Sequence, residues 1–279
     1  MRLVTYDAGA GPRVGALEDG EVVDLGFDGD MVAFMAGGAP AGEQRPVAGA
    51  RLLAPLRPRS LRDFLAFEGH MKAALSRLGR PIPPGWYEVP AYYKGMPDTV
   101  IGPDEVIPWP AWTEHLDHEL ELAAVIGREA RDVPTQEAGS CIFGYTIWND
   151  VSARDVQARE LPVGMGPGKA KDWDGSNVLG PCLVTADQLD PNALAMRVRV
   201  NGNLWGEDSS ANMHHTFADM IAYASRSQTL RPGEVLGSGT AAGGSGLELD
   251  RRLAPGDLLE LEIEGIGVLR NRIGERGAG

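Results

Sequence analysis

The sequence predicts a strand-rich α+β fold. Short apolar runs recur along the chain, and Gly- and Pro-rich turns separate most of them. The chain has 37 glycines and 20 prolines but only 6% aromatic residues, which favours short strands and turns over long helices. With 43% hydrophobic residues in 279, it can bury a sizeable core. We expect a small N-terminal β domain at residues 1–55 and a large domain at 56–279.

Charge and cysteine content exclude several classes of partner. The 39 Asp and Glu against 26 Lys and Arg give a net charge of −13, whereas nucleic acids and anionic membranes need a cationic face. We therefore expect neither partner. Two cysteines, Cys141 and Cys182, cannot form a Cys-rich zinc site, so a reducing cytoplasm is expected. The N-terminus lacks the apolar core of a signal peptide, and no segment is long enough to span a bilayer.

The small domain is predicted from three apolar runs separated by Gly- and Asp-rich turns. They cover residues 3–6, 14–17 and 22–25. Residues 33–49 are rich in Ala, Gly and Pro and are expected to form a loose connector.

A helix is predicted over residues 60–78. Ser60 suits its N-cap, Asp63 completes a capping-box-like start, and apolar residues recur at a spacing of about 3.6. Gly69 is unusual inside a helix and indicates a break before His70.

Strands dominate the rest of the large domain. A Pro- and aromatic-rich loop at residues 81–93 precedes them, and a short helix is predicted at 217–225. Asn201-Gly202 is typical of a two-residue hairpin turn. The strands are predicted at residues 121–127, 144–150, 182–185, 196–200, 234–236 and 257–264.

Segment 115–125 combines acidic residues with an apolar strand. Since side chains alternate along a strand, Glu119 and Glu121 share the face of Ala123 and Val125. Taken alone, this fits a half-exposed strand with two solvated acids. The acidic face becomes apolar within two residues, however, so we expect it to enter the interior, where neighbouring carboxylates must protonate or bind a cation. Oxygen ligands favour Mg²⁺, Mn²⁺ or Ca²⁺ over zinc.

A second polar segment, residues 149–157, follows an apolar strand. One interpretation is an Asx turn with a surface arginine. In the other, Asp150 is a further metal ligand, and Arg154 and Gln157 point into the same cleft. Spacings of four and three would place all three residues on one helical face.

Several known motifs are missing. The Lys169–Lys171 loop is typical of a solvent-exposed segment, and Val163 and Ala170 break the Walker pattern there. The Gly-rich residues 237–243 lack the dinucleotide fingerprint. Neither HExxH nor GxSxG occurs, which disfavours a zincin and an α/β-hydrolase.

Together these segments resemble the fumarylacetoacetate hydrolase family, from about residue 56 to 273. The marks of the resemblance are residues 116–122, 149–155 and 262–271, of which the middle motif is long and specific. The first fifty residues resemble the short N-terminal unit of many bacterial members. The resemblance implies a mixed β-roll or sandwich catalytic domain and a homodimer.

The resemblance also implies a divalent-metal site, with Mg²⁺ expected and Mn²⁺ or Ca²⁺ as alternatives. Glu119, Glu121 and Asp150 match the family's metal carboxylates. Asp63 matches a fourth acidic ligand found in the hydrolases proper.

The remaining site residues are likewise implied by the resemblance. His70 matches the general base of the hydrolases, and Glu248 matches the acid that orients it. Some smaller members carry a catalytic Glu three residues after the His, where this chain has Ala73, so the Glu248 route is favoured. The oxyanion- and substrate-binding groups match Arg154, Gln157 and Lys171, and the substrate-contacting positions match Tyr93 and Thr240.

The resemblance predicts a hydrolase that cleaves the C–C bond of a β-diketo acid such as an acylpyruvate or fumarylpyruvate. The hydrolases proper have a substrate Tyr where this chain has Leu161, which argues against fumarylacetoacetate itself. Oxaloacetate-type decarboxylation and enol–keto isomerisation are alternatives, and a non-catalytic metabolite-binding protein is a third. The other histidines are expected to be structural or solvent-facing: His115, His118, His214 and His215.

Overall fold

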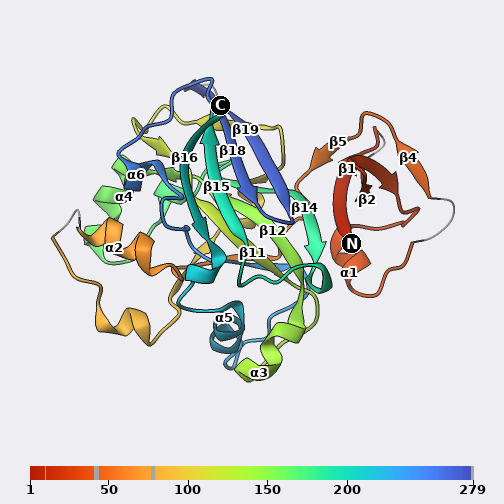
Figure 1. Cartoon of the computed structure of the whole chain (residues 1–279), viewed down its shortest axis with the longest axis horizontal. Helices are drawn as coiled ribbons and strands as arrows, with labels where there is room; N and C mark the ends of the chain where they lie inside the picture. Colours follow the sequence, from red (N-terminus) through yellow and green to blue (C-terminus); the bar gives the residue numbers. More distant parts are fainter. Residues whose placement is uncertain (10, 41–43, 77–78, 278–279) are drawn as a thin grey trace.

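The computed structural model describes residues 1–9, 11–40, 44–76 and 79–277. These residues form two large β-sheets with short helices around them, and the N-terminal strands stand to one side (Figure 1). Strands are the main element, so the predicted strand-rich α+β class is confirmed. In this part of the chain, no helix is both long and apolar enough to cross a membrane.

The larger sheet runs through both parts of the molecule. Its strands are β1 (Arg2–Asp7), β2 (Pro12–Glu18), β3 (Glu21–Asp24), β4 (Arg45–Val47), β5 (Arg51–Leu53), β6 (Ser60–Phe64), β7 (Tyr92–Gly95), β8 (Val100–Ile101), β11 (Leu120–Ile126), β12 (Ile142–Asp150), β14 (Asn177–Thr185) and β17 (Glu234–Gly237). The order is β4-β3-β2-β1-β14-β12-β11-β17-β6-β7, with β5 paired to β1 and β8 paired to β14. The β17–β6 and β14–β8 pairs are parallel.

The second sheet packs against the larger one. Its strands are β9 (Val106–Trp109), β15 (Ala195–Val200), β16 (Asn203–Ser209), β18 (Leu258–Ile263) and β19 (Gly267–Arg276), in the order β16-β15-β18-β19-β9. Leu122 and Ile147 of the larger sheet share one buried core with Val198 and Leu261 of the second. This shared core makes the large domain a mixed sandwich. A separate ribbon pairs β10 (Leu116–Asp117) with β13 (Ser152–Ala153).

The helices are short and gather in two places around the sheets. They are α1 (Met31–Met35), α2 (Glu68–Ser76), α3 (Thr135–Ala138), α4 (Arg154–Glu160), α5 (Phe217–Ala224) and α6 (Gly246–Leu249). Figure 1 shows α3 and α5 together below the sheets, and α2, α4 and α6 on the side away from the N-terminal strands. This second group carries several of the residues predicted to act in the site.

The three N-terminal strands are confirmed as β1, β2 and β3. Strand β1 pairs with β14 of the large domain, so the N-terminal unit extends the larger sheet. Its Leu3 and Met31 pack in one core with Val125 and Trp148. The division of the chain at residue 55 remains a prediction.

Two of the predicted connections contain regular structure. The loop at residues 81–93 includes a 3₁₀ turn at Pro84–Tyr87 and the first residues of β7. The connector expected at residues 33–49 is partly wrong, because it includes the end of α1 and all of β4. The Asp30 side chain caps α1, and the helix buries Phe34 and Met35. Residues 41–43 lie outside the described residues.

The helix predicted over residues 60–78 is only half right. Residues 60–64 form β6, and the helix starts at Glu68. Because β6 lies between β17 and β7, both of its edges are hydrogen-bonded and nearly all its side chains are buried. An all-buried strand does not alternate, so its apolar residues resembled a helical pattern. Residues 77–78 lie outside the described part of the chain.

The six strands predicted between residues 121 and 264 are confirmed, although β14 begins at Asn177 rather than at 182. The helix predicted at 217–225 is confirmed as α5. The hairpin between β15 and β16 is confirmed as well. Its two turn residues, Asn201 and Gly202, have φ values of +51° and +76°, as a two-residue hairpin turn with positive φ at both positions requires.

Candidate active site

Four buried carboxylates converge beside the larger sheet. One oxygen from each lies within 4.8 Å of the chosen oxygens of the other three. No residue of the four is more than 4% exposed, so the solvated-acid interpretation of the 115–125 segment is wrong. They come from β6, from the residue before β11, from β11 and from the end of β12, and are Asp63, Glu119, Glu121 and Asp150.

The order of the strands explains this convergence. Strand β11 has β12 on one side and β17 on the other, and β17 pairs with β6 so that Asp63 lies opposite Gly237. Glu121 shares the face of Ala123 and Val125, and both of these pack into one apolar core, as the alternation predicts. Three distant stretches of sequence therefore meet on one face.

Gly237 makes room for the Glu121 carboxylate. A Cβ atom at this position would collide with that carboxylate and with the Trp148 ring. Gly237 was not among the residues predicted from the sequence. A glycine is needed at this position because of the strands that lie next to β17. The sequence could not show this, since a glycine after an apolar run is very common.

Burial and mutual repulsion keep most of the cluster from ionising. Burial raises the pKa of Asp63, Glu121 and Asp150, and the negative charges of neighbouring carboxylates raise each further. Burial acts in the same direction on Glu119, but Lys171 and Arg154 outweigh it and lower the pKa of Glu119. If all four carboxylates were ionised, the cluster would carry more negative charge than Lys171 and Arg154 neutralise.

The donor atoms fit a hard divalent cation. Among the described residues, Asp63 Oδ1, Asp150 Oδ1 and both carboxylate oxygens of Glu121 are buried without a hydrogen-bond partner. Buried acceptors normally have partners, so these oxygens require a proton or a cation. An all-oxygen set of carboxylates suits Mg²⁺, Mn²⁺ or Ca²⁺. The cluster could thus hold a metal ion.

Lys171 reaches the cluster from the 3₁₀ turn Lys169–Lys171. Its Nζ lies 2.6 Å from Glu119 Oε2 and also contacts Asp150 Oδ2. Burial opposes its charge, but Asp150 and Glu119 outweigh burial and raise the pKa of Lys171. The expectation that this lysine pair is solvent-exposed holds for Lys169 and is wrong for Lys171.

Arg154 begins α4 and lies between two carboxylates. Its Nε donates to Asp117 Oδ2 at 2.8 Å, and its Nη1 lies 2.7 Å from Glu119 Oε1. Nη1 also donates to Gln157 Oε1 at 3.0 Å. In the described part of the chain its buried Nη2 has no partner, so this nitrogen can donate to a ligand.

The single helical face predicted for Asp150, Arg154 and Gln157 is partly wrong. Asp150 is the last residue of β12, and only Arg154 and Gln157 belong to α4. The short strand β13 lies between them and pairs with β10, which interrupts a helical path. The three side chains still reach the same region, because Arg154 and Asp150 are joined through Glu119 and Lys171.

His70 and Glu248 form a buried pair between two helices. His70 Nδ1, from α2, lies 3.1 Å from Glu248 Oε1, from α6. The two atoms are close enough for a hydrogen bond, but the contact does not have hydrogen-bond geometry: among the described residues, both atoms are buried without a hydrogen-bond partner. The Ser245 side chain caps α6 by accepting from the Glu248 amide, which fixes the acidic residue in the first turn.

Tyr93 contacts the carboxylate cluster, whereas Thr240 makes no polar contact with it in the described structure. Tyr93 Oη donates to Asp150 Oδ2 at 2.6 Å, and Lys171 Nζ lies 5.5 Å from the centre of its ring. Burial and the charges of Asp150 and Asp63 raise the pKa of Tyr93 well above its usual range. Thr240 is buried in the segment that joins β17 to α6, without a polar contact to the cluster in the described structure.

The four other histidines lie outside the carboxylate cluster. His118 is fully buried, with its ring beside Trp205, and burial lowers its pKa. His115 is half-buried, and burial lowers its pKa too. His214 and His215 bind backbone carbonyl oxygens of the 84–87 turn through Nε2. These placements agree with structural or solvent-facing roles.

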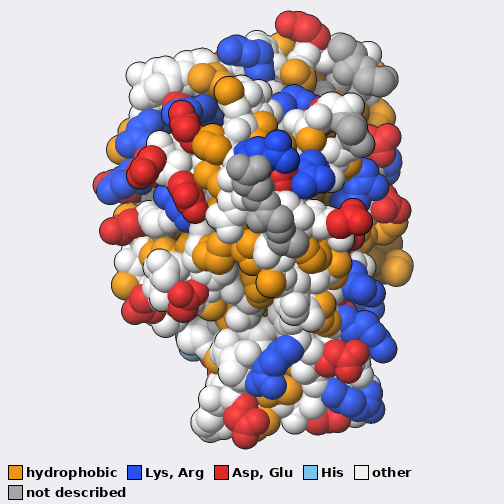
Figure 2. All heavy atoms as spheres, turned by 90° about the vertical axis from the view of Figure 1, so that its right-hand side faces the viewer, with side chains coloured by type: hydrophobic (Ala, Val, Ile, Leu, Met, Phe, Trp, Pro, Cys, Tyr) orange, Lys and Arg blue, Asp and Glu red, His pale blue; other side chains and the backbone are white. Residues whose placement is uncertain are grey.

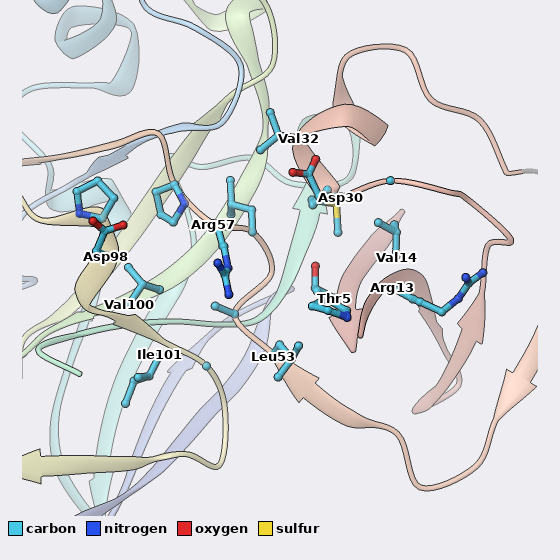
Figure 3. A pocket seen from close by; sticks show the side chains of 18 of the residues that line it. Thr5, Arg13, Val14, Asp30, Val32, Leu53, Arg57, Asp98, Val100 and Ile101 are labelled. Carbon is cyan, nitrogen blue, oxygen red and sulfur yellow. The ribbon is translucent and has the colours of Figure 1, made fainter. Parts of the chain in front are cut away.

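A cavity of about 430 Å³ lies elsewhere, at the junction of the N-terminal unit and the larger sheet. Figure 3 shows Arg57 projecting into it between Thr5 and Leu53 on one side and Val100 on the other. None of the predicted site residues lines this cavity. The candidate site is therefore identified by its side-chain chemistry and burial.

The face that carries the N-terminal unit shows no segregation of charge. Basic and acidic side chains alternate over it, and hydrophobic side chains gather in a band across its middle (Figure 2).

Comparison with known families identifies the large domain. The model of the fumarylacetoacetate (FAA) hydrolase C-terminal domain matches residues 60–274, which hold all four carboxylates and the His70–Glu248 pair. The chain belongs to the fumarylacetoacetate hydrolase family. A second family model, Rv2993c-like N-terminal, matches residues 1–55.

Relatives in the fumarylacetoacetate hydrolase family include several kinds of enzyme. The human mitochondrial oxaloacetate tautomerase FAHD2A is 32% identical in sequence, and the match covers 98% of this chain and 91% of the tautomerase sequence. The solved structure of 5-carboxymethyl-2-hydroxymuconate delta-isomerase from Mycobacterium smegmatis superimposes on this one with a TM-score of 0.81. The match covers 99% of this chain and 100% of the isomerase chain, at 30% sequence identity. The fumarylacetoacetate hydrolase from Exiguobacterium antarcticum has a TM-score of 0.83 at 28% identity, with 99% and 100% coverage.

Proposed function

We propose that this protein is a divalent-metal-dependent hydrolase that cleaves the C–C bond of a β-diketo acid of the acylpyruvate or fumarylpyruvate type. The observation that carries the proposal is the buried His70–Glu248 pair. The protein has this pair in addition to a four-carboxylate cluster that Lys171 and Arg154 contact. A cluster of carboxylates is enough to bind a cation. A paired histidine beside it is what activation of water requires.

Asp63, Glu119, Glu121 and Asp150 would hold the cation, with Mg²⁺ expected and Mn²⁺ or Ca²⁺ as alternatives. When bound, such an ion polarises carbonyl oxygens and neutralises the carboxylates. The ion, Arg154 and Lys171 then offset most of the negative charge of the four carboxylates and of Asp117, which also pairs with Arg154. This balance allows a buried site in an acidic protein to accept an anionic keto acid.

His70 is the proposed general base. Its Nδ1 faces Glu248, which leaves Nε2 to take a proton from water. The water oxygen adds to a carbonyl carbon of the substrate, and the adjoining C–C bond then breaks. The carbon that receives the electron pair takes the proton back from His70. An acylpyruvate would give a carboxylic acid and pyruvate.

Arg154, Lys171 and Gln157 are the proposed oxyanion-binding groups. The unpartnered Nη2 of Arg154 and the Nζ of Lys171 supply positive charge in a water-poor site. Donors of this kind typically contribute about 3 kcal/mol each to transition-state stabilisation. Tyr93 and Thr240 are proposed to contact the substrate.

A screen of β-diketo acids tests the proposal. Purified protein is stripped with EDTA, reloaded with Mg²⁺, Mn²⁺ or Ca²⁺, and mixed with acylpyruvates of increasing acyl length. We expect metal-dependent loss of the enol absorbance together with stoichiometric release of pyruvate. Loss of absorbance without pyruvate would instead indicate tautomerisation, and no change with any substrate would contradict the hydrolase assignment.

Oxaloacetate-type decarboxylation or enol–keto isomerisation is the second candidate. The human oxaloacetate tautomerase, similar over nearly the whole chain, and the M. smegmatis isomerase favour it. These reactions need the cation and proton transfer, but no attacking water. Oxaloacetate is therefore included in the screen, with keto–enol exchange and CO₂ release followed separately.

A non-catalytic metabolite-binding protein is the least favoured alternative, because such a protein has no use for a buried paired histidine. Calorimetric titration with Mg²⁺ or Mn²⁺ tests it, and absence of binding would favour it. We further propose a cytoplasmic homodimer. Light scattering coupled to size-exclusion chromatography measures the oligomeric state.

A further inference from the structure

Asp117 is a fully buried carboxylate with no role in the proposed reaction so far. Its Oδ2 accepts hydrogen bonds from Arg154 Nε at 2.8 Å and from the Leu247 amide at 3.0 Å. Its Oδ1 accepts from the amides of Gly246 at 2.9 Å and His118 at 3.0 Å. Two oxygens thus receive four donors from three segments of the chain.

Three of these four donors belong to two helices, α4 and α6, that each carry residues of the proposed site. Arg154 begins α4, and Gly246 and Leu247 form the first turn of α6, immediately before Glu248. The fit is close on the α6 side, because a Cβ at Gly246 would lie 2.7 Å from Asp117 Oδ1. Asp117 therefore contacts both Arg154, the proposed oxyanion-binding residue, and Leu247, which immediately precedes Glu248.

The contact also determines which nitrogen of Arg154 is available. Asp117 binds Nε and Glu119 binds Nη1, so the planar guanidinium is held from two directions and Nη2 is the nitrogen left over. Removing Asp117 would leave the guanidinium held only through Nη1, by Glu119 and Gln157, and free to rotate about that end. Buried ion pairs add little net stability compared with apolar residues of the same volume, so a fixed geometry is the better explanation for this one.

We propose that Asp117 is a positioning residue that holds the Arg154 guanidinium and the Glu248-bearing turn of α6 in one frame, an inference that rests on the proposed function. It acts through Arg154 and α6 and does not itself contact the substrate.

Asp117→Asn tests the inference in the full-length, Mg²⁺-loaded protein. Each Asp117 oxygen accepts two hydrogen bonds, so the amide nitrogen of an asparagine must face two of the four donors. We expect kcat for the β-diketo acid to fall about 10²-fold with little change in KM, as for a misplaced catalytic group. Affinity for Mg²⁺ should stay within about threefold, because the four carboxylates are unchanged. A kcat within about twofold of the wild type would overturn the inference.

Oxalate binding supplies a readout that does not depend on turnover. Calorimetry with the Mg²⁺-loaded protein should show affinity for oxalate about tenfold weaker in Asp117→Asn, the size of one lost charged hydrogen bond. In an Arg154→Lys background the same substitution should have a clearly smaller effect. An equal effect in both backgrounds would show that Asp117 does not act through Arg154.

Two further variants protect the interpretation. Asp155→Asn changes a carboxylate on the same helix that serves Thr113 and Glu114 instead, and should leave kcat and oxalate affinity unchanged. If Asp117→Asn does not fold, Gly246→Ala is the alternative: its added Cβ would lie 2.7 Å from Asp117 Oδ1 and 2.7 Å from the Arg251 carbonyl oxygen, and the charge is unaltered. This variant should weaken oxalate binding by about threefold or more, and a folded Gly246→Ala with normal oxalate affinity would contradict the coupling.

The outcomes separate this inference from the proposed function. If the wild type cleaves no β-diketo acid but Asp117→Asn still weakens oxalate binding, the hydrolase assignment fails and the positioning role stands. If the wild type is a hydrolase and oxalate affinity does not change in the variant, the positioning role fails alone.

Discussion

The Lys171 ammonium lies 2.6 Å from the Glu119 carboxylate, inside a cluster that is proposed to bind a divalent cation. It also contacts Asp150, so it shares two carboxylates with that cation. A positive side chain in this position repels a bound dication and competes for its ligands. Its presence is easier to explain by a catalytic role than by metal binding.

Lys171→Met should therefore separate metal binding from catalysis. We expect Mg²⁺ affinity equal to or higher than that of the wild type, and hydrolysis reduced by about 10²- to 10³-fold through the loss of one oxyanion donor. Calorimetry and the pyruvate-release assay measure the two effects. Lys169→Met, two residues away on the exposed side of the turn, is the control and should change neither. Loss of Mg²⁺ binding in Lys171→Met would show that the lysine supports the cluster itself.

The stability of the metal-free protein should fall as the pH rises. The pKa of Asp63, Glu121 and Asp150 is raised in the folded state, so above about pH 4 these three groups bind more protons in the folded protein than in the unfolded chain. The lowered pKa values of His115 and His118 act in the opposite direction, but they involve two groups against three. Deprotonation then favours unfolding. We expect thermal denaturation of EDTA-treated protein to show a Tm that decreases between about pH 5 and pH 8, and Mg²⁺ to reverse most of this decrease.

Glu121→Gln tests whether the carboxylate cluster causes the predicted pH dependence of stability. The variant should be more stable than the wild type at pH 8 without metal, because a neutral amide has no charge to bury beside Asp63 and Asp150. Mg²⁺ should then stabilise it much less. Glu137→Gln, at an exposed position on α3, should behave like the wild type. An unchanged pH dependence in Glu121→Gln would place the titrating groups elsewhere.

His70→Ala should distinguish hydrolysis from the alternative reactions. Removing the proposed base should reduce β-diketo acid cleavage by about 10²- to 10⁴-fold while sparing much of any oxaloacetate decarboxylation. The two reactions are followed in parallel on the same preparations. His214→Ala removes a histidine that binds a carbonyl oxygen of the 84–87 turn, and it should keep both activities. Unimpaired cleavage by His70→Ala would contradict the assignment of the base.

Gly237→Ala should disturb the metal site through packing alone. The added methyl group meets the Glu121 carboxylate and the Trp148 ring, which are both buried. We expect weaker Mg²⁺ binding and a loss of about 1–3 kcal/mol in stability, as overpacked cores show. Gly139→Ala, where a Cβ has open space, is the matched control. Normal Mg²⁺ affinity in Gly237→Ala would show that Glu121 is not a ligand or can move freely.

Local sequence patterns correctly predicted several features of the fold and of the candidate site. Alternation along the strand correctly predicted that Glu121 shares the inner face of Ala123 and Val125, because the side-chain period of a strand is independent of its partners. Turn chemistry likewise located the Asn201-Gly202 hairpin. By contrast, β6 was mistaken for helix. Both of its edges are paired and nearly all its side chains are buried, and such a strand has no alternation to read.

By itself, the sequence determined which residue types were available, among them acidic residues leading into an apolar strand and a histidine seven residues after Asp63. It determined the face on which a side chain lies only along β11, where Glu121 alternates with apolar residues. Only the tertiary structure decided which of them meet. Strand order placed β17 between β11 and β6, and so set Gly237 beside Glu121 and opposite Asp63. It also buried Lys171 and gave Asp117 its four donors. Those contacts join residues far apart in the chain, and no local periodicity encodes which strand a segment will pair with.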